Sequence, residues 1–551
     1  MGERKTRKKV AIIGGGISGI ITAATLQSDG HDCTVFEAME RLGGVWAYDS
    51  YPGARLQNMG WQYHHPDLDW PTATIADEHP TREQICDYID YCSQTFDLNV
   101  RLETRVVQLK EVHNGNGWTL VSEKHGVKDQ EDFDFCIVAQ GLYNDSTKRG
   151  HKASNGTIQQ QWEGTDEFIS KGGTIMTRHD TNMNFAKLDG KRVAVIGFGK
   201  TAVDCCELSC QNGAAETYHI FRTARWLIPE TIFSIDNTWL LFNRINGETI
   251  PAWGHPGRAQ HFLYSHFIWI FIYLWSGIQT LIWGLYFSHA WFKQTIIQKR
   301  FQQLRPSHPL LRDHRSAAAL CPTSFFQLVA DGSLIPIRGT VERCDEEGLV
   351  LSDGTKVAVD VVFVCIGNGV TAPQFSYLPH KYRQFLETDS FGPQLYRHLI
   401  HPDIPNMAFA GFNHGFLHCP HVYLGAIWIS CVLRGEMTLP PATEQRSCMA
   451  RIKAWKAEHI EAEPTTNCSV ATRIFHYNDT LMRDLGLKPH RKMNPIAEIF
   501  ARYGAKDYAG VLHQIQQKRE NPGETFQAVS LRLRHVANKK CIFFHHCTPC
   551  V

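Results

Sequence analysis

The chain has 551 residues, which is enough for two or more domains with sizeable cores. Its 56 lysines and arginines almost cancel its 55 aspartates and glutamates, which argues against nucleic acid or an acidic polymer as the partner. The 17 cysteines are scattered and no secretory leader precedes the first strand, so we expect free thiols and a cytoplasmic protein.

Residues 8–37 have the pattern of a strand, a turn, a helix and a second strand. A β-branched run at 9–14 leads into Gly-Gly-Gly-Ile-Ser-Gly at 14–19 and an alanine-rich helix. Glycines here allow a tight turn, the approach of a pyrophosphate and close packing of helix on strand. The second strand ends in Glu37, whose carboxylate could bind a ribose hydroxyl. This spacing predicts a dinucleotide site, whereas a glycine turn before an ordinary helix would not require the acid.

The next segments indicate that the same site continues. Glycine-rich turns at 41–46 and 51–58 suggest backbone lying against the rest of a bound dinucleotide. An amphipathic helix is predicted over 81–96, and strand-like runs at 101–107 and 117–123 predict an antiparallel ribbon. A buried strand at 133–141 then returns to the sheet.

A second strand and glycine turn repeat the first pattern at 190–204. Ala202 stands in place of the third glycine, a change that the helix-packing position tolerates. The following strand ends in Arg222 instead of an acid. A guanidinium suits a 2′-phosphate, so this site is expected to prefer NADPH to NADH. Two such units imply two cofactors, or one cofactor and its reductant.

Residues 259–292 contain no charged side chain apart from histidine and are rich in aromatic residues. The segment is long enough to cross a bilayer, but one crossing would put the flanking domains on opposite sides. A hairpin or a helix lying in the interface is therefore expected, which would place the protein on the cytosolic face of an internal membrane. A buried lid or a channel wall for an apolar substrate is the alternative.

A buried strand at 359–367 echoes the strand at 133–141 and is interpreted as a return to the first domain, which makes the second unit an insertion. Residues beyond 438 predict a helical cap. The Cys/His run at 541–550 fits no common zinc spacing, so no metal site is expected. The predicted parts are 1–165, first part of the first domain; 166–330, second domain with the apolar insert; 331–437, second part of the first domain; and 438–551, cap and tail.

The chain lacks a Cys-x4-Cys pair after Gly44, which disfavours a disulfide reductase, and no metal triad or Ser/His/Asp spacing stands out. The cofactors must then carry the reaction. The order of the two glycine turns, Glu37 and Gly-Gly-Val-Trp at 43–46 resembles the flavin-containing monooxygenases, of the class B flavoprotein monooxygenases. Further segments that resemble the plant-type branch of that family lie at 55–71, 195–204, 221–229, 396–405 and 477–479.

The resemblance implies an α/β fold with two nested Rossmann-like dinucleotide-binding domains, an FAD domain that is discontinuous, an inserted NADPH domain and a helical C-terminal cap. It also implies that NADPH reduces FAD, that O2 adds to form a C4a-hydroperoxyflavin, and that a nitrogen or sulfur of a small molecule, lipophilic to judge from the apolar insert, takes one oxygen atom. Asn58 lies where the family has a catalytic asparagine; an ordinary turn residue is the alternative.

The expected FAD-binding residues are Gly14, Gly15, Gly16, Ile17, Gly19, Glu37, Gly44, Val45, Trp46, Val106 and Gly367. The expected NADPH-binding residues are Gln57, Gly197, Gly199, Lys200, Thr201 and Arg222.

The sequence departs from the family at two places and leaves two other functions open. The fingerprint between the glycine turns is degraded at 168–179, where His179 is expected to keep the histidine position, and Cys365-Ile-Gly367 replaces Ala-Thr-Gly. The run Tyr51-Pro-Gly-Ala-Arg55 also resembles a Baeyer–Villiger monooxygenase segment, but Gln57 stands where that group has an acid. A membrane-associated flavoprotein that binds without turnover is the alternative of another class.

Overall fold

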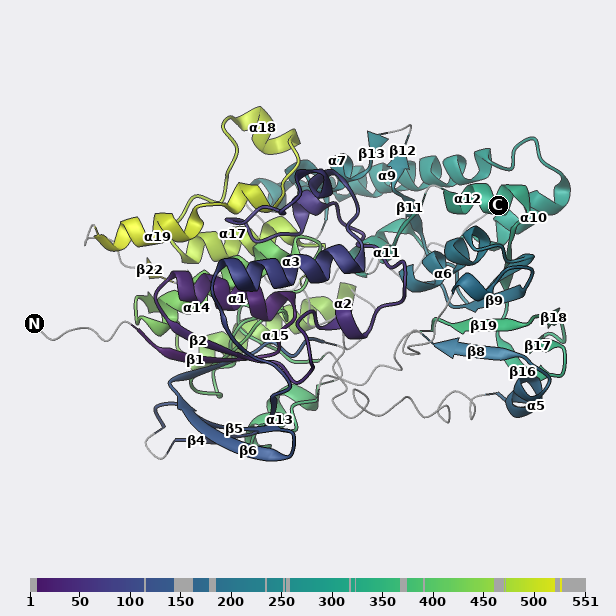
Figure 1. Cartoon of the computed structure of the whole chain (residues 1–551). Coiled ribbons are helices and arrows are strands. Elements are labelled where there is room, and N and C mark those ends of the chain that lie inside the picture. The colour runs from purple at the N-terminus through teal and green to yellow at the C-terminus, as the bar shows by residue number, and fades with distance from the viewer. Residues whose placement is uncertain are drawn as a thin grey trace, which may run out of the picture.

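The computed structural model describes residues 7–112, 115–142, 162–177, 185–232, 235–250, 253, 258–316, 319–322, 324–366, 374–389, 392–459, 470, 472–520 and 526–527. Figure 1 shows two α/β units, the first around β1, α1 and α14 and the second around β9 and α6. Gly367, His179 and the Cys/His run at 541–550 lie outside the described residues.

The first unit is built on a parallel five-stranded sheet in the order β20-β7-β1-β2-β3. Its central strands are apolar without alternation because both faces of the sheet are covered. The strands are β1 (Lys9–Ile13), β2 (Asp32–Phe36), β3 (Asn99–Arg101), β7 (Phe135–Val138) and β20 (Met407–Phe409). One face carries α1 (Ile17–Ser28), α3 (Arg82–Thr95) and α14 (His418–Leu433).

The other face of this sheet packs on a three-stranded antiparallel ribbon. Its strands are β4 (Arg105–Glu111), β5 (Trp118–Lys124) and β6 (Val127–Phe133), and α13 (His380–Glu387) adds Tyr382 and Leu386 to the same core. The ribbon and the helix at 81–96 are confirmed. The third strand was not predicted because 127–133 is almost entirely polar.

The second unit is a parallel sheet in the order β15-β10-β9-β19-β8. Its strands are β8 (Thr174–Thr177), β9 (Arg192–Ile196), β10 (Glu216–Phe221), β15 (Leu334–Arg338) and β19 (Val361–Val364). Helices α6 (Lys200–Gln211), α10 (Thr295–Gln303) and α12 (Ser324–Asp331) share its main core. Helix α5 (Thr165–Ser170) and the ribbon of β16 (Val341–Asp345), β17 (Gly348–Leu351) and β18 (Lys356–Ala358) pack on the other face.

The assignment of the strand at 359–367 to the first domain is wrong. β19 pairs with β9 and β8 of the second sheet, and β15 lies at the edge of that same sheet. The second unit therefore extends past 330 to at least Val364, and the chain rejoins the first sheet at β20. The nested order is confirmed, because β20 completes a sheet begun by β1 and β7.

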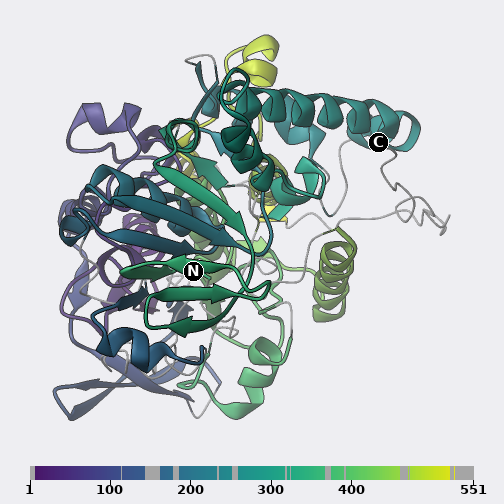
Figure 2. The same cartoon turned by 90° about the vertical axis from the view of Figure 1, so that its right-hand side faces the viewer.

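The apolar insert forms one continuous helix, α9 (Arg258–Ser288). Of the two arrangements that the sequence left open, the hairpin is therefore wrong, and the contact of a single helix with a membrane stays a prediction. Figure 2 shows α9 as a long teal helix at the top of the molecule. Within the described part of the chain, no helix combines the length and the apolar character needed to span a bilayer. Other elements around it are α7 (Thr238–Leu241), α8 (Arg244–Thr249), α11 (Leu310–Ser316), β11 (Leu227–Pro229), β12 (Thr231–Ile232), β13 (Ile235–Asp236) and β14 (Ala319–Cys321).

The C-terminal region is helical, as predicted. It consists of α15 (Ala442–His459), α17 (Ile474–Asp484), α18 (Pro495–Phe500), α19 (Val511–Glu520) and the short pair β21 (Met437–Thr438) and β22 (Phe526–Gln527). Two buried arginines fix α17: the Arg397 Nε donates to Asp484 at 2.7 Å and the Arg244 Nη1 donates to Asp479 at 2.8 Å. The second bond joins the cap to the segment that precedes α9.

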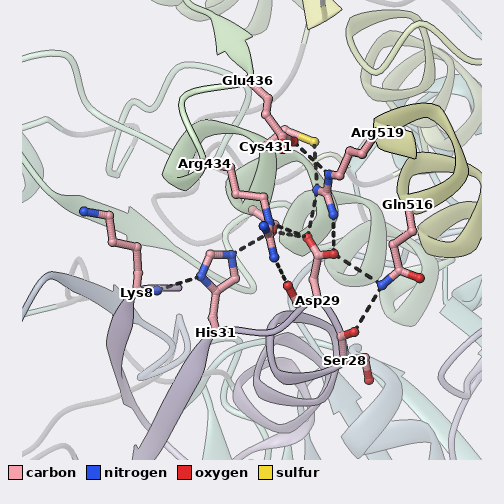
Figure 3. Close-up of polar contacts among 10 residues, drawn as sticks. Lys8, Ser28, Asp29, His31, Cys431, Arg434, Glu436, Gln516 and Arg519 are labelled. Carbon is pink, nitrogen blue, oxygen red and sulfur yellow. Dashed lines mark hydrogen bonds and ion pairs between the residues drawn. The ribbon is translucent and has the colours of Figure 1, made fainter. Parts of the chain in front are cut away.

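A buried polar cluster fastens the last helix to the first unit (Figure 3). Asp29, at the end of α1, has a side chain only 1% exposed, and it accepts hydrogen bonds from Arg519 of α19 at 2.5 and 2.9 Å and from Arg434 at 3.3 Å. Ser430 also donates to the same carboxylate. Burial raises the pKa of the Asp29 carboxyl, but the bonds from Arg519 and Ser430 and both positive charges outweigh it, so the pKa lies below its ordinary value.

Replacing this carboxylate is expected to weaken the whole fold. Asp29→Asn leaves two largely buried arginines short of an anion, which costs on the order of 3 kcal/mol, and we expect a melting temperature lower by several degrees. The control is Asp69→Asn, which breaks an exposed pair with Lys506 and should cost less than about 1 kcal/mol.

The difference in stability between wild type and Asp29→Asn should depend on pH. Because the folded pKa of Asp29 lies below its ordinary value of 3.8, the stabilisation is present above that pH and is lost only below it. The difference between wild type and Asp29→Asn should therefore be full at pH 5 to 8. Equal melting temperatures for the two proteins at pH 7 would contradict the assignment.

Candidate functional site

The first glycine turn is packed so closely that a side chain has no room at several of its positions. A Cβ on Gly14, whose φ is +116°, would lie 2.5 Å from the carbonyl oxygen of Ala139, and one on Gly19 would lie 2.0 Å from that of Gly14. The turn at 41–46 faces this glycine turn, since a Cβ on Gly44 would lie 3.1 Å from Cα of Gly16. Such a cradle fits a pyrophosphate on the N-terminus of α1.

Glu37 lies beside this cradle at the carboxyl end of β2. Its buried carboxylate accepts hydrogen bonds from the backbone N–H of Gly15 at 2.7 Å and of Met39 at 2.9 Å. Two accepted bonds leave lone pairs for a ribose hydroxyl, since a carboxylate offers about four acceptor positions. The Glu37 carboxylate is thus fixed at the end of β2, the position that the sequence predicts for binding the ribose of a dinucleotide.

A loop that the sequence did not indicate, 411–418, closes the site opposite the turn. Asn58 Nδ2 donates to the carbonyl of Phe416 at 2.8 Å, and His418 Nε2 lies 2.8 Å from the hydroxyl of Ser18 in the glycine turn. Asn58 is buried, and its contact comes from 358 residues along the chain. The available signal was the Gly-rich run at 411–415, which follows a buried strand and precedes a helix.

His418 is held as a neutral imidazole. Burial, together with the neighbouring rings of His414 and His421, keeps its pKa well below 6.5. Its Nδ1 is buried and has no hydrogen-bond partner among the residues that the structure describes. Tyr63 stacks on its ring at 6.3 Å and accepts a bond from Trp46 Nε1 at 3.3 Å. An orphaned polar atom between the glycine turn and these aromatic rings is consistent with a polar ligand, as FAD would provide.

The second turn has the same backbone and different charges. A Cβ on Gly197, with φ +127°, would lie 2.3 Å from the carbonyl of Cys365, whereas Gly199 faces open space. Arg222 is exposed at the end of β10, and Lys200 begins α6. The two cations and the open approach fit a phosphorylated dinucleotide such as NADPH.

His219 supports the second turn from behind. Its Nε2 donates to the carbonyl of Gly197 at 2.7 Å, and burial lowers its pKa to about 4, although the same bond opposes the shift. The ring packs between Phe198 and Phe325. A neutral histidine therefore fixes the turn at neutral pH.

The remaining expected residues divide between surface and core. Ile17 and Val106 are buried in the two cores that flank the first sheet, and Gln57 and Thr201 are half-buried. Val45 is 36% exposed. Phe168 of the degraded fingerprint is buried in the second unit. Among the described residues, no group of three or more His, Cys, Asp or Glu could hold a metal ion.

Comparisons with known proteins agree with this geometry. Residues 12–74 match the family model of the NAD(P)-binding Rossmann-like domain. The chain is 27% identical to a protein of Arabidopsis thaliana described as probable flavin-containing monooxygenase 1, over 92% of this chain and 97% of that protein.

Two solved structures share the fold over nearly the whole chain. A cyclohexanone monooxygenase bound to cyclohexanone superposes with a TM-score of 0.59 and 15% identity, covering 93% of this chain and 98% of its own. An S-allyl-L-cysteine S-oxygenase from Allium sativum has a TM-score of 0.56 and 18% identity, covering 94% of each chain.

Proposed function

The chain belongs to the flavin-containing monooxygenase family, and we propose that it is an FAD- and NADPH-dependent monooxygenase that transfers one oxygen atom of O2 to the nitrogen or sulfur of a lipophilic small molecule. The observation that carries this proposal is the pair of bare glycine turns, one beside the acid Glu37 and one beside the cations Lys200 and Arg222. An acid suits the unmodified ribose of FAD, and cations suit the 2′-phosphate of NADPH.

The chain's own groups would bind and orient the two nucleotides. Backbone N–H groups at the start of α1 and α6 would bind the pyrophosphates, and the macrodipole of each helix would favour their negative charge. FAD, when bound, would supply the redox chemistry that reacts with O2. Tyr63, which lies beside His418, and Trp46, which packs against Tyr63, would supply an apolar wall that excludes water and so strengthens the polar contacts made there.

Reduction and oxygenation can be followed directly. Purified protein should be yellow with bound FAD, should be bleached by NADPH without oxygen, and should then give, with O2 and NADP+, a long-lived absorbance band that differs from oxidised flavin. An amine and a thioether should give N-oxide and sulfoxide. Lactone or ester from a ketone as the sole product would favour the Baeyer–Villiger alternative, and a flavin that NADPH cannot bleach would favour a binding module.

Asn58 is proposed to act on the reacting oxygen. Its amide is fixed by Phe416 at the edge of the first site, so its remaining polar groups are preorganised. Removing one such preorganised donor typically lowers a rate by about 100-fold. Asn58→Ala should still oxidise NADPH but should release hydrogen peroxide. The amount of oxygenated product formed per NADPH consumed should fall at least ~10-fold.

The matched control is Asn246→Ala on α8, which removes a 2.8 Å bond from Nδ2 to a carbonyl, that of Leu241, and belongs to neither glycine turn. Its ratio of product to NADPH should equal that of the wild type. If Asn58→Ala also keeps that ratio, Asn58 is an ordinary turn residue.

We further propose that α9 and the segment after it, as far as Ile296 at the start of α10, rest on a lipid surface. One face of α9 packs on the second core through Trp275, Ile282 and Tyr286, while the other exposes apolar side chains. The exposed apolar residues are Ile270, Tyr273, Leu274, Leu281, Trp291, Phe292 and Ile296. Phe292 is 97% exposed, and no acid occurs between Arg258 and Arg312. A stripe of this kind without negative charge suits an anionic membrane interface.

Vesicle sedimentation tests this surface. Wild type should sediment with vesicles of phosphatidylcholine and phosphatidylserine, and Trp291→Ser/Phe292→Ser should sediment several-fold less because it buries less apolar area. The control is Met493→Ser/Ile496→Ser, which removes equally exposed apolar residues from another surface. A wild-type protein that stays in solution with every vesicle would overturn the proposal.

A further inference from the structure

The segment 51–58 passes from the core of the second unit to the core of the first. Tyr51 and Ala54 are buried among the residues of the second core, whereas Leu56 is buried in the first. Two residues later, Asn58 bonds the loop that closes the first site. Within eight residues the chain therefore reaches both candidate nucleotide sites.

At its second-unit end, the segment holds the helix that begins at the second turn. The phenol of Tyr51 donates a 2.5 Å hydrogen bond to Oδ2 of Asp204 on α6, and Oδ1 of Asp204 lies 2.7 Å from the ammonium of Lys200. The side chains of Lys200 and Asp204 are only 15% and 8% exposed. Tyr51 and Lys200, 149 positions apart, are thus joined through one buried carboxylate.

A second contact fixes the same face of α6. Gly53, with φ +80°, lies against Leu208, one helical turn beyond Asp204, and a Cβ at Gly53 would come within 3.1 Å of the Leu208 side chain. The turn therefore packs along α6 by shape as well as by hydrogen bond. Burial and the charge of Asp204 raise the pKa of the Tyr51 phenol well above its usual range, so the phenol remains a donor at neutral pH.

The ion pair with Asp204 leaves donors of the Lys200 ammonium for a ligand. An ammonium has three donors, and the ion pair with Asp204 uses one direction, leaving the others for a phosphate at the open side of Gly199. Because Tyr51 shares the Asp204 carboxylate, that carboxylate cannot turn fully toward the lysine. The position of the lysine is then set in part by Tyr51, which belongs to the segment that continues to the first site.

We infer that Tyr51 and Asp204 are positioning residues that hold the second nucleotide site in register with the first, so that the reduced nicotinamide of NADPH meets the flavin. This inference rests on the proposed function. It concerns the geometry of electron transfer between the sites. In Tyr51→Phe, Lys200 keeps its charge and its ion pair with Asp204, so the affinity for the nucleotide should change little.

The test compares Tyr51→Phe with Tyr382→Phe. Tyr382 is also buried and donates a 2.7 Å bond to a carboxylate, that of Glu111, within the core between α13 and the ribbon. Tyr51→Phe should keep its FAD and bind NADP+ within about 3-fold of wild type, while the rate of flavin reduction at saturating NADPH falls about 10-fold or more, since small misplacements of reacting groups carry large rate costs. Tyr382→Phe should change neither quantity.

Asp204→Asn and the double variant Tyr51→Phe/Asp204→Asn complete a cycle. If the two residues act through one bond, the double variant should reduce flavin no more slowly than the slower single variant. Unchanged reduction in Tyr51→Phe, or effects of the two substitutions that simply multiply, would overturn the inference. A lower melting temperature with an unchanged reduction rate would assign Tyr51 a structural role alone. Failure of the wild-type flavin to be reduced would instead reject the proposed function.

Discussion

A pyrophosphate can lie on a protein backbone only where no side chain stands between them, and this steric constraint shapes both units. It is met at the carboxyl ends of β1 and β9, where Gly14 and Gly197 adopt positive φ values and press against the strand beside them, at Ala139 and Cys365. In each case the neighbouring strand, β7 or β19, is buried and parallel. The sheets are thus the support that allows two bare turns to exist in one chain.

The difference between the sites arises from what stands beside each turn. In the first, the carboxylate of Glu37 is consumed in part by two backbone bonds, so it is fixed in place before any ligand binds. In the second, the charge is positive, and the turn is supported from behind by the neutral ring of His219. Preorganisation of this kind reduces the ordering that binding must otherwise impose.

The sequence predicted the two turns, the ribbon and the nested order, because each depends on local patterns that glycine spacing and strand burial reveal. The ligand-binding roles of Glu37 and Arg222 stay predictions. The sequence did not predict to which sheet β19 belongs. A buried parallel strand has the same apolar pattern in either sheet, and only its pairing with β9 and β8 decides. The sequence also offered no sign of His418, because its partner Ser18 lies 400 residues away along the chain. For the insert, the sequence left a hairpin and a single interfacial helix open, because apolar composition does not reveal the core in which Trp275 and Tyr286 are buried.

Helix α14 explains how the distant C-terminal region can affect the first turn. It packs along α1, and it is tied to that helix at both ends: His418 contacts Ser18 at the start, and Ser430 contacts Asp29 at the finish. The two helices therefore run in the same direction, and their N-termini meet beside the glycine turn, where their dipoles add for an anion. Parallel helices repel weakly through those same dipoles, so the pair needs an external fastening. Arg434 and Arg519 provide it at the carboxyl ends, where positive charge is favourable, and Arg519 brings α19 with it (Figure 3). The geometry of the first nucleotide site is in this way coupled to the last described helix of the chain.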